Sequence, residues 1–304
     1  MISTGRRSSG MASTTGYVDV DGCSLYYEVD GSGPPILYFH GGFGGLGTGL
    51  APEPPVFKDR IAERNKFVFF HRRSAGRSDT SPGLHTLAQF GDDGEGLLDH
   101  LGIDDAIIWG ESGGVAIAST FALERPRRTS ALILTDGAPW FTRDRGVDHR
   151  LRERLKILQE EGAEAAYAAR KVHGTVGLEV FAPDRPTTEA DTKLREAAKN
   201  QIQAQISSIP REERIAKYAA ELQTYAAYLD FDISDRISEI QVPLFVAFGT
   251  SDSIFPNVDW PEYLHDLPNV TYYPVVGAEH GILDNETLAE VILRFIAKAS
   301  QVGV

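Results

Sequence analysis

Residues 106–115 read Ala-Ile-Ile-Trp-Gly-Glu-Ser-Gly-Gly-Val, an apolar run that ends abruptly in small and polar residues. Four apolar side chains in a row, from Ala106 to Trp109, are typical of a strand buried on both faces of a parallel sheet. Helical spacing begins near Val115 and stops before Pro126. The sequence therefore predicts that Ser112 lies in a sharp turn between a buried strand and a helix.

The same alternation of strand and helix extends along the chain in both directions. Leu84–Leu101 has the spacing of an amphipathic helix, and short apolar runs predict further buried strands at Ile36–Phe39, Phe67–Phe70 and Ala131–Leu134. Upstream, two alternating segments flank Asp21-Gly22, which indicates a β-hairpin. This order predicts an α/β fold with a mostly parallel central sheet and helices on both faces.

The strand signal disappears over residues 139–239, where the composition turns to Ala, Glu, Arg and Leu. It returns at Leu244–Phe248 and Val270–Val275, and an amphipathic helix follows at Leu288–Ala297. The sequence therefore predicts a core made of residues 16–138 and 240–304, interrupted by a helical cap insertion at 139–239. The Ser/Thr/Gly-rich residues 1–15 are predicted to be disordered.

Charge and cysteine content exclude several function classes. The 304 residues include 30 Lys and Arg against 43 Asp and Glu, a formal net charge of −13. Nucleic acids and anionic membranes repel such a chain, so we expect neither as a partner. Cys23 is the single cysteine, which excludes an internal disulfide and a cysteine-based zinc site. Without an 18-residue apolar run or a signal peptide, we expect a soluble, cytoplasmic protein; its oligomeric state is not predicted.

Three residues at the carboxyl ends of predicted strands suggest acyl-transfer chemistry. A serine hydroxyl becomes a good nucleophile when a histidine removes its proton and a carboxylate orients that histidine. Ser112 is flanked at two-residue offsets by Gly110 and Gly114, as a strand-turn-helix nucleophile requires. His280 follows the last strand in a Gly-rich turn, a better position than that of the other seven histidines.

Two aspartates compete for the orienting role. Asp252 lies four residues beyond the strand Leu244–Phe248, and Asp136 lies at the exit of the preceding strand. We favour Asp252 and keep Asp136 as the alternative acid.

The order Ser112, Asp252, His280 resembles that of the capped α/β-hydrolase fold superfamily over nearly the whole chain. Further matches are His40-Gly41-Gly42, residues 97–103, the acid loop Gly249-x-x-Asp252-x-x-x-Pro256, and residues 71–78. The last segment resembles the family's D-x-R-G-x-G-x-S loop, with His71 in place of Asp and Ser74 in place of Gly. The resemblance implies that the N–H of Gly113, together with that of Gly42 or Phe43, forms an oxyanion hole.

The residue type at the sharp turn between strand and helix, here called the elbow, also distinguishes the reactions of this superfamily. Epoxide hydrolases and haloalkane dehalogenases of this superfamily carry an aspartate there, so Ser112 indicates acyl transfer. We expect a serine hydrolase that cleaves a carboxylic ester or lactone, or an amide, through an acyl-enzyme on Ser112. No metal or cofactor is expected. The substrate would be a small, mainly apolar molecule. Aromatic side chains would line its binding site, and Trp140, Phe141 and Phe255 are the candidates.

Two other functions stay open at this point. His40-Gly41-Gly42-Phe43-Gly44 is similar to the H-G-G-P-G of proline iminopeptidases, although the proline is absent. A ligand-binding receptor or a lyase can also be built on the same scaffold, because a fold does not determine a function.

Overall fold

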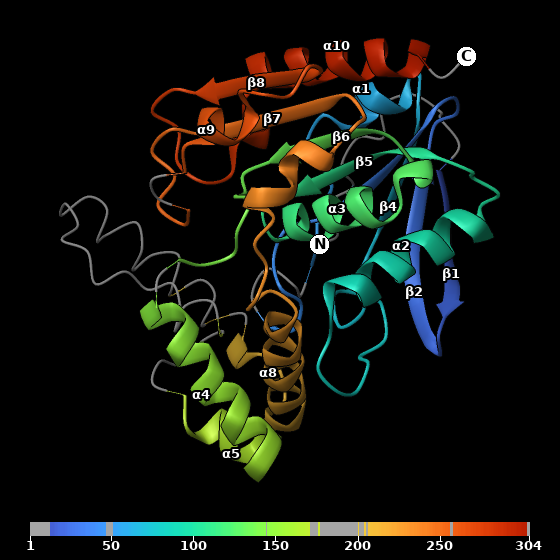
Figure 1. Cartoon of the computed structure of the whole chain (residues 1–304). Helices are drawn as coiled ribbons and strands as arrows, with labels where there is room; N and C mark the ends of the chain where they lie inside the picture. Colours follow the sequence, from blue (N-terminus) through green and yellow to red (C-terminus); the bar gives the residue numbers. More distant parts are fainter. Residues whose placement is uncertain are drawn as a thin grey trace.

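The computed structural model describes residues 13–46, 51–143, 145–170, 176, 200, 204, 206–255 and 258–302. An eight-stranded sheet runs through the molecule in the order β1-β2-β4-β3-β5-β6-β7-β8 (Figure 1). Only β2 runs against its neighbours, and all the other pairs from β4 to β8 are parallel. The strands are β1 (Ser13–Val20), β2 (Cys23–Asp30), β3 (Pro35–Phe39), β4 (Lys66–Phe70), β5 (Ala106–Glu111), β6 (Thr129–Thr135), β7 (Leu244–Gly249) and β8 (Val270–Val275).

Helices cover both faces of the sheet, which confirms the predicted layers (Figure 1). The side chain of Ile108 belongs to the apolar cluster beneath α2 (Leu87–His100) and α3 (Gly113–Glu124). Its neighbours Ile107 and Trp109 point to the opposite cluster, beneath α1 (Lys58–Ala62) and α10 (Glu286–Val302). Because successive side chains of a strand alternate between faces, a strand covered on both sides must be apolar at every position.

A helical insertion lies between β6 and β7, although these two strands pair directly, and three of its helices have their bounds within the described residues. They are α4 (Arg145–Glu161), α5 (Ala163–Ala168) and α8 (Arg211–Ala226), and they form a separate group beside one end of the sheet (Figure 1). The other short elements are the helix α9 (Trp260–Leu264) and the 3-10 segments η2 (Pro126–Arg128), η3 (Ser234–Glu239) and η4 (Ile282–Asp284). The cap boundaries at 139 and 239 stay a prediction.

The predicted N-terminal boundary needs a correction. Residues 13–15 belong to β1 and pair with residues 28–30 of β2, so a disordered segment cannot extend to residue 15. The hydrogen bonds of an antiparallel ladder hold this polar stretch in a strand although its side chains are mostly exposed. The remaining residues of that predicted segment, 1–12, lie outside the described part of the chain, as does Pro256 of the acid loop.

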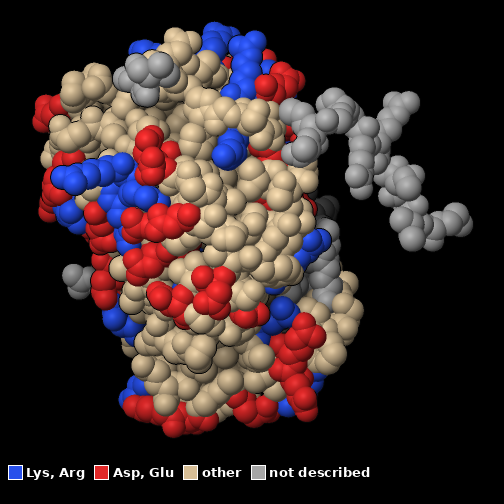
Figure 2. Space-filling view, turned by 90° about the vertical axis from the view of Figure 1, so that its right-hand side faces the viewer, with Lys and Arg blue, Asp and Glu red and all other residues tan. Residues whose placement is uncertain are grey.

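Charges of both signs are mixed over the molecular face in Figure 2, and acidic side chains edge its lower end. No helix in the described ranges is long and apolar enough to cross a bilayer.

Candidate active site

Ser112 occupies the turn between β5 and α3 with φ 49° and ψ −116°, a strained conformation for a residue other than glycine. Small neighbours make this turn possible. A Cβ on Gly110 would lie 2.4 Å from the carbonyl oxygen of Gly114, and a Cβ on Gly114 would lie 2.0 Å from that of Phe39. The turn therefore places the Ser112 side chain, half-buried, at the carboxyl edge of the sheet beside the N-terminus of α3.

Two hydrogen bonds connect the three predicted catalytic side chains. Ser112 Oγ lies 2.9 Å from His280 Nε2, and His280 Nδ1 lies 2.8 Å from Asp252 Oδ2. The other oxygen, Asp252 Oδ1, accepts from the backbone N–H groups of Ile254 and Phe255 at 2.8 and 3.0 Å. The Asp252 carboxylate is fully buried, so its orientation is set by the acid loop and not by solvent.

The charge of Asp252 controls the protonation of His280. Burial by itself would lower the pKa of this imidazole, but the hydrogen bond to Asp252 and the nearby carboxylates outweigh burial and raise it. Since the Asp252 carboxylate can only accept, Nδ1 carries the proton, and Nε2 is left with a lone pair that faces Ser112 Oγ.

Asp136 lies beside this chain but does not bond to the imidazole. Its Oδ2 accepts from the backbone N–H of Ile282 at 2.8 Å, two residues beyond His280. One oxygen of Asp136, one of Asp252 and one nitrogen of His280 lie within 4.8 Å of one another. Burial raises the pKa of Asp136 to about 7, and the charge of His280 and the bond from Ile282 oppose that rise. Asp136 therefore anchors the histidine turn.

The predicted oxyanion loop lies against the elbow. A Cβ on Gly113 would meet the carbonyl oxygen of Gly42 at 2.8 Å and the ring of Phe43 at 3.4 Å. The N–H groups of Gly42 and Gly113 donate to no other described residue. Gly42 has φ 76°, a backbone conformation that glycine adopts without strain.

Aromatic rings surround these groups. Phe255 lies 6.0 Å from the His280 ring and 6.4 Å from Trp140, measured between ring centroids. Phe43 packs edge-on against Phe141 at 5.5 Å. Trp140, Phe141 and Phe255, the three residues predicted to line the substrate, are therefore all buried. Phe255 lies near the His280 ring, Trp140 near Phe255, and Phe141 against Phe43 of the oxyanion loop.

Sequence reasoning missed the aromatic contribution of the helical insertion. Tyr225, in α8, stacks on Phe43 with 4.1 Å between ring centroids, and Tyr228 meets Phe43 edge-on at 4.9 Å. Their three-residue spacing puts both rings on one side of a helical segment, a signal that the sequence carries. Glu111 was also missed: its Oε2 accepts from the Tyr38 hydroxyl at 2.7 Å and from the N–H of Gly41 at 3.2 Å.

Comparison with known proteins identifies the family to which this chain belongs. The family model described as alpha/beta hydrolase fold matches residues 34–287, a span that includes the elbow, Asp252 and His280. The chain belongs to the α/β-hydrolase family. A curated relative, the putative carbamate hydrolase RutD of Caulobacter vibrioides, is 27% identical over 286 residues, covering 92% of this chain and 97% of that protein. The family and this relative's name support a hydrolase.

Solved structures of α/β-hydrolases share the fold. A thermophilic esterase from Thermogutta terrifontis superposes with a TM-score of 0.68 at 19% identity, covering 96% of this chain and all 100% of that one. An enol-lactonase from Burkholderia xenovorans LB400 gives a TM-score of 0.63 at 19% identity, covering 93% and 99%. At this identity the likeness shows the fold alone.

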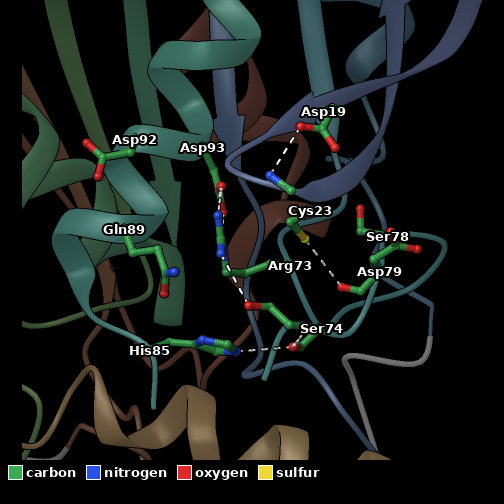
Figure 3. A network of polar contacts seen from close by, with 12 residues as sticks. Asp19, Cys23, Arg73, Ser74, Ser78, Asp79, His85, Gln89, Asp92 and Asp93 are labelled. Atoms are coloured by element: carbon green, nitrogen blue, oxygen red, sulfur yellow. Dashed lines mark hydrogen bonds and ion pairs between the residues drawn. The ribbon is translucent and has the colours of Figure 1, made fainter. Parts of the chain in front are cut away.

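This α/β-hydrolase departs from its family in the loop of residues 71–78, and the structure explains how the departures are tolerated. His71 Nδ1 accepts from the backbone N–H of Arg77 at 2.8 Å, because burial lowers the pKa of His71 to about 4 and leaves a free lone pair. Ser74 adopts φ 65°, the left-handed conformation for which the family's glycine is suited. Its hydroxyl bonds to His85 Nε2 at 3.1 Å (Figure 3).

Proposed function

We propose that this α/β-hydrolase is a serine hydrolase that cleaves a carboxylic ester or lactone of a small, mainly apolar substrate. The observation that carries the proposal is the hydrogen-bonded chain Ser112–His280–Asp252, in which the free lone pair of Nε2 faces the serine hydroxyl. This arrangement is what proton removal from a serine nucleophile requires.

The reaction follows from the positions of these atoms. Ser112 Oγ attacks the substrate's carbonyl carbon while His280 Nε2 takes the hydroxyl proton, and the carbonyl electrons move onto oxygen. The resulting imidazolium is stabilised by the buried carboxylate of Asp252. His280 then returns the proton to the leaving alcohol oxygen, and the acyl group remains on Ser112. Water, deprotonated by the same nitrogen, attacks the acyl carbon; the bond from that carbon to Ser112 Oγ breaks, His280 returns the proton to Oγ, and the acid is released.

Negative charge develops on the carbonyl oxygen during both attacks. We assign the role of receiving this charge to the N–H of Gly113, at the N-terminus of α3, together with that of Gly42 or Phe43; the contact between the loop of Gly42 and Gly113 supports this assignment. Phe43, Trp140, Phe141 and Phe255 offer apolar surface for the acyl or alcohol group, which favours esters and lactones over charged substrates.

Covalent labelling tests the nucleophile. A fluorophosphonate probe followed by peptide mapping is expected to mark Ser112, and the Ser112→Ala variant is expected to lose labelling and turnover while it remains folded. Turnover by Ser112→Ala at more than a trace of the wild-type rate would refute the assignment.

A substrate panel separates the proposal from its alternatives. We expect p-nitrophenyl esters and lactones to be hydrolysed faster than proline-β-naphthylamide; the opposite order would indicate an iminopeptidase. Tight binding without multiple turnover would indicate a receptor, and product release without an acyl-enzyme in the mass spectrum would indicate a lyase.

A further inference from the structure

Arg72 is a buried cation directly beneath the candidate oxyanion loop. Its side chain is 1% exposed, and no carboxylate oxygen of the described residues lies within ion-pair distance of it. The next residue, Arg73, is equally buried but is paired with the carboxylate of Asp93 (Figure 3). A buried guanidinium without a counter-ion is costly, so its retention here needs a physical reason.

The hydrogen bonds of Arg72 point to that reason. One terminal nitrogen, Nη2, donates to the carbonyl oxygen of Gly41 at 3.2 Å and also to that of Gly42. The other terminal nitrogen donates to the Tyr228 hydroxyl at 2.7 Å, and the guanidinium carbon lies 5.6 Å from the centroid of the Phe90 ring. Every acceptor in this set is neutral.

Those two carbonyl groups belong to the peptide units that carry the candidate oxyanion donors. The C=O of Gly41 shares its peptide with the N–H of Gly42, and the C=O of Gly42 shares its peptide with the N–H of Phe43. A hydrogen bond from a cation to the oxygen of a peptide polarises the group and strengthens its N–H as a donor. Through its hydrogen bonds to these two carbonyl oxygens, Arg72 would therefore polarise both donor N–H groups from the carbonyl side of their peptides.

His40 completes the arrangement. The backbone N–H and Nε–H of Arg72 approach His40 Nε2 at 3.3 and 3.5 Å, which makes Nε2 the acceptor. The proton of the imidazole is then on Nδ1, which donates to the carbonyl oxygen of Gly41 at 2.6 Å. Burial and the charge of Arg72 lower the pKa of His40 well below its usual value, so the ring stays neutral.

We propose that Arg72 is a positioning residue for the oxyanion hole, acting through the peptide groups 41–42 and 42–43. In the resting site no carboxylate of the described residues pairs with its charge, and the oxyanion of the tetrahedral intermediate brings a negative charge to the N–H side of these peptide groups. An interaction that strengthens only when negative charge develops raises kcat and leaves ground-state binding nearly unchanged. This inference rests on the proposed acyl-transfer function.

The test compares Arg72→Met, Arg72→Gln and Arg72→Lys with the control Arg77→Gln, which removes an exposed arginine of the same loop. Active sites are first titrated with a fluorophosphonate, so that kcat refers to folded, reactive protein. Kinetics on a p-nitrophenyl ester then give kcat and KM separately. An alkyl trifluoromethyl ketone, which forms an oxyanion on addition of Ser112 Oγ, reports on binding of the charged intermediate.

Removal of the charge in Arg72→Met is expected to lower kcat about 10- to 100-fold, less than the loss of a direct oxyanion donor. KM should stay within about threefold, and affinity for the trifluoromethyl ketone should fall by the same factor as kcat. Arg72→Lys should recover part of both losses because it keeps the charge, whereas Arg77→Gln should stay within about twofold of the wild type.

An unchanged kcat in titrated Arg72→Met, or a loss confined to KM, would overturn this inference while leaving the serine hydrolase intact. Arg72→Gln serves the same comparison if Arg72→Met does not fold. A wild-type protein without Ser112 labelling or ester turnover would instead overturn the proposed function, and the role of Arg72 with it.

Discussion

Substitution of the candidate acid offers a sharp test of the site, because the carboxylate of Asp252 accepts three hydrogen bonds of two kinds. Oδ1 accepts from two backbone N–H groups, and Oδ2 accepts from His280 Nδ1. In Asp252→Asn the amide oxygen keeps the two backbone bonds, so the loop keeps its shape. The amide nitrogen then takes the place of Oδ2 and points its hydrogens at Nδ1.

This substitution reverses the tautomer of the His280 imidazole. Nδ1 must become the acceptor, so the proton moves to Nε2 and faces Ser112 Oγ, where a base is needed. The wrong tautomer lowers kcat by about 10⁴ in a triad of this type, which corresponds to about 5.5 kcal/mol in the activation free energy. The fold should survive, since both backbone hydrogen bonds are retained.

The matched control is Asp136→Asn. Its amide oxygen can still accept from the N–H of Ile282, and no hydrogen bond from Asp136 to the imidazole is lost. We expect kcat/KM to fall by less than about tenfold. Both variants would be assayed on one p-nitrophenyl ester after active-site titration. If Asp136→Asn lost more activity than Asp252→Asn, the reasoning would be refuted and Asp136 would be the orienting acid.

Three further predictions follow from burial and charge. Protonated His280 cannot accept a proton, so kcat/KM should fall as the pH drops through the raised pKa of His280, with a midpoint above 6.5; a midpoint below 6 in a pH–rate profile would contradict this. Because the pKa of Asp136 rises from 3.8 to about 7 on folding, its contribution to stability is present below pH 4 and is lost as the pH rises to 7. Between pH 5 and pH 8, the unfolding free energy of Asp136→Asn in urea titrations should therefore rise relative to that of the wild type by up to about 2.7 kcal/mol, and an equal difference at both pH values would count against it. Arg73→Met leaves the buried carboxylate of Asp93 unpaired and should cost about 3–5 kcal/mol of unfolding free energy; an unaltered urea midpoint would show that the pair is dispensable.

The sequence by itself determined the α/β architecture and indicated Ser112 and His280, and it favoured Asp252 over Asp136 as the acid. Buried parallel strands must be apolar at every position, so they stand out from amphipathic helices by composition and period. The elbow was equally readable, because Gly110 is required by a close contact with the carbonyl oxygen of Gly114, four residues further along the chain. Steric requirements between residues that are close in the chain can be inferred from the local sequence alone.

Only the tertiary structure decided how distant segments meet. Asp136 and Asp252 both follow strands, and their sequence contexts are alike; the difference is that Asp252 Oδ2 reaches His280 Nδ1 while Asp136 bonds to a backbone N–H. Likewise, nothing in residues 71–78 showed that Arg72 turns toward the oxyanion loop and Arg73 toward Asp93. The side-chain directions of a loop with left-handed residues follow no period, and the acceptors come from segments far away in the chain, so packing alone selects them.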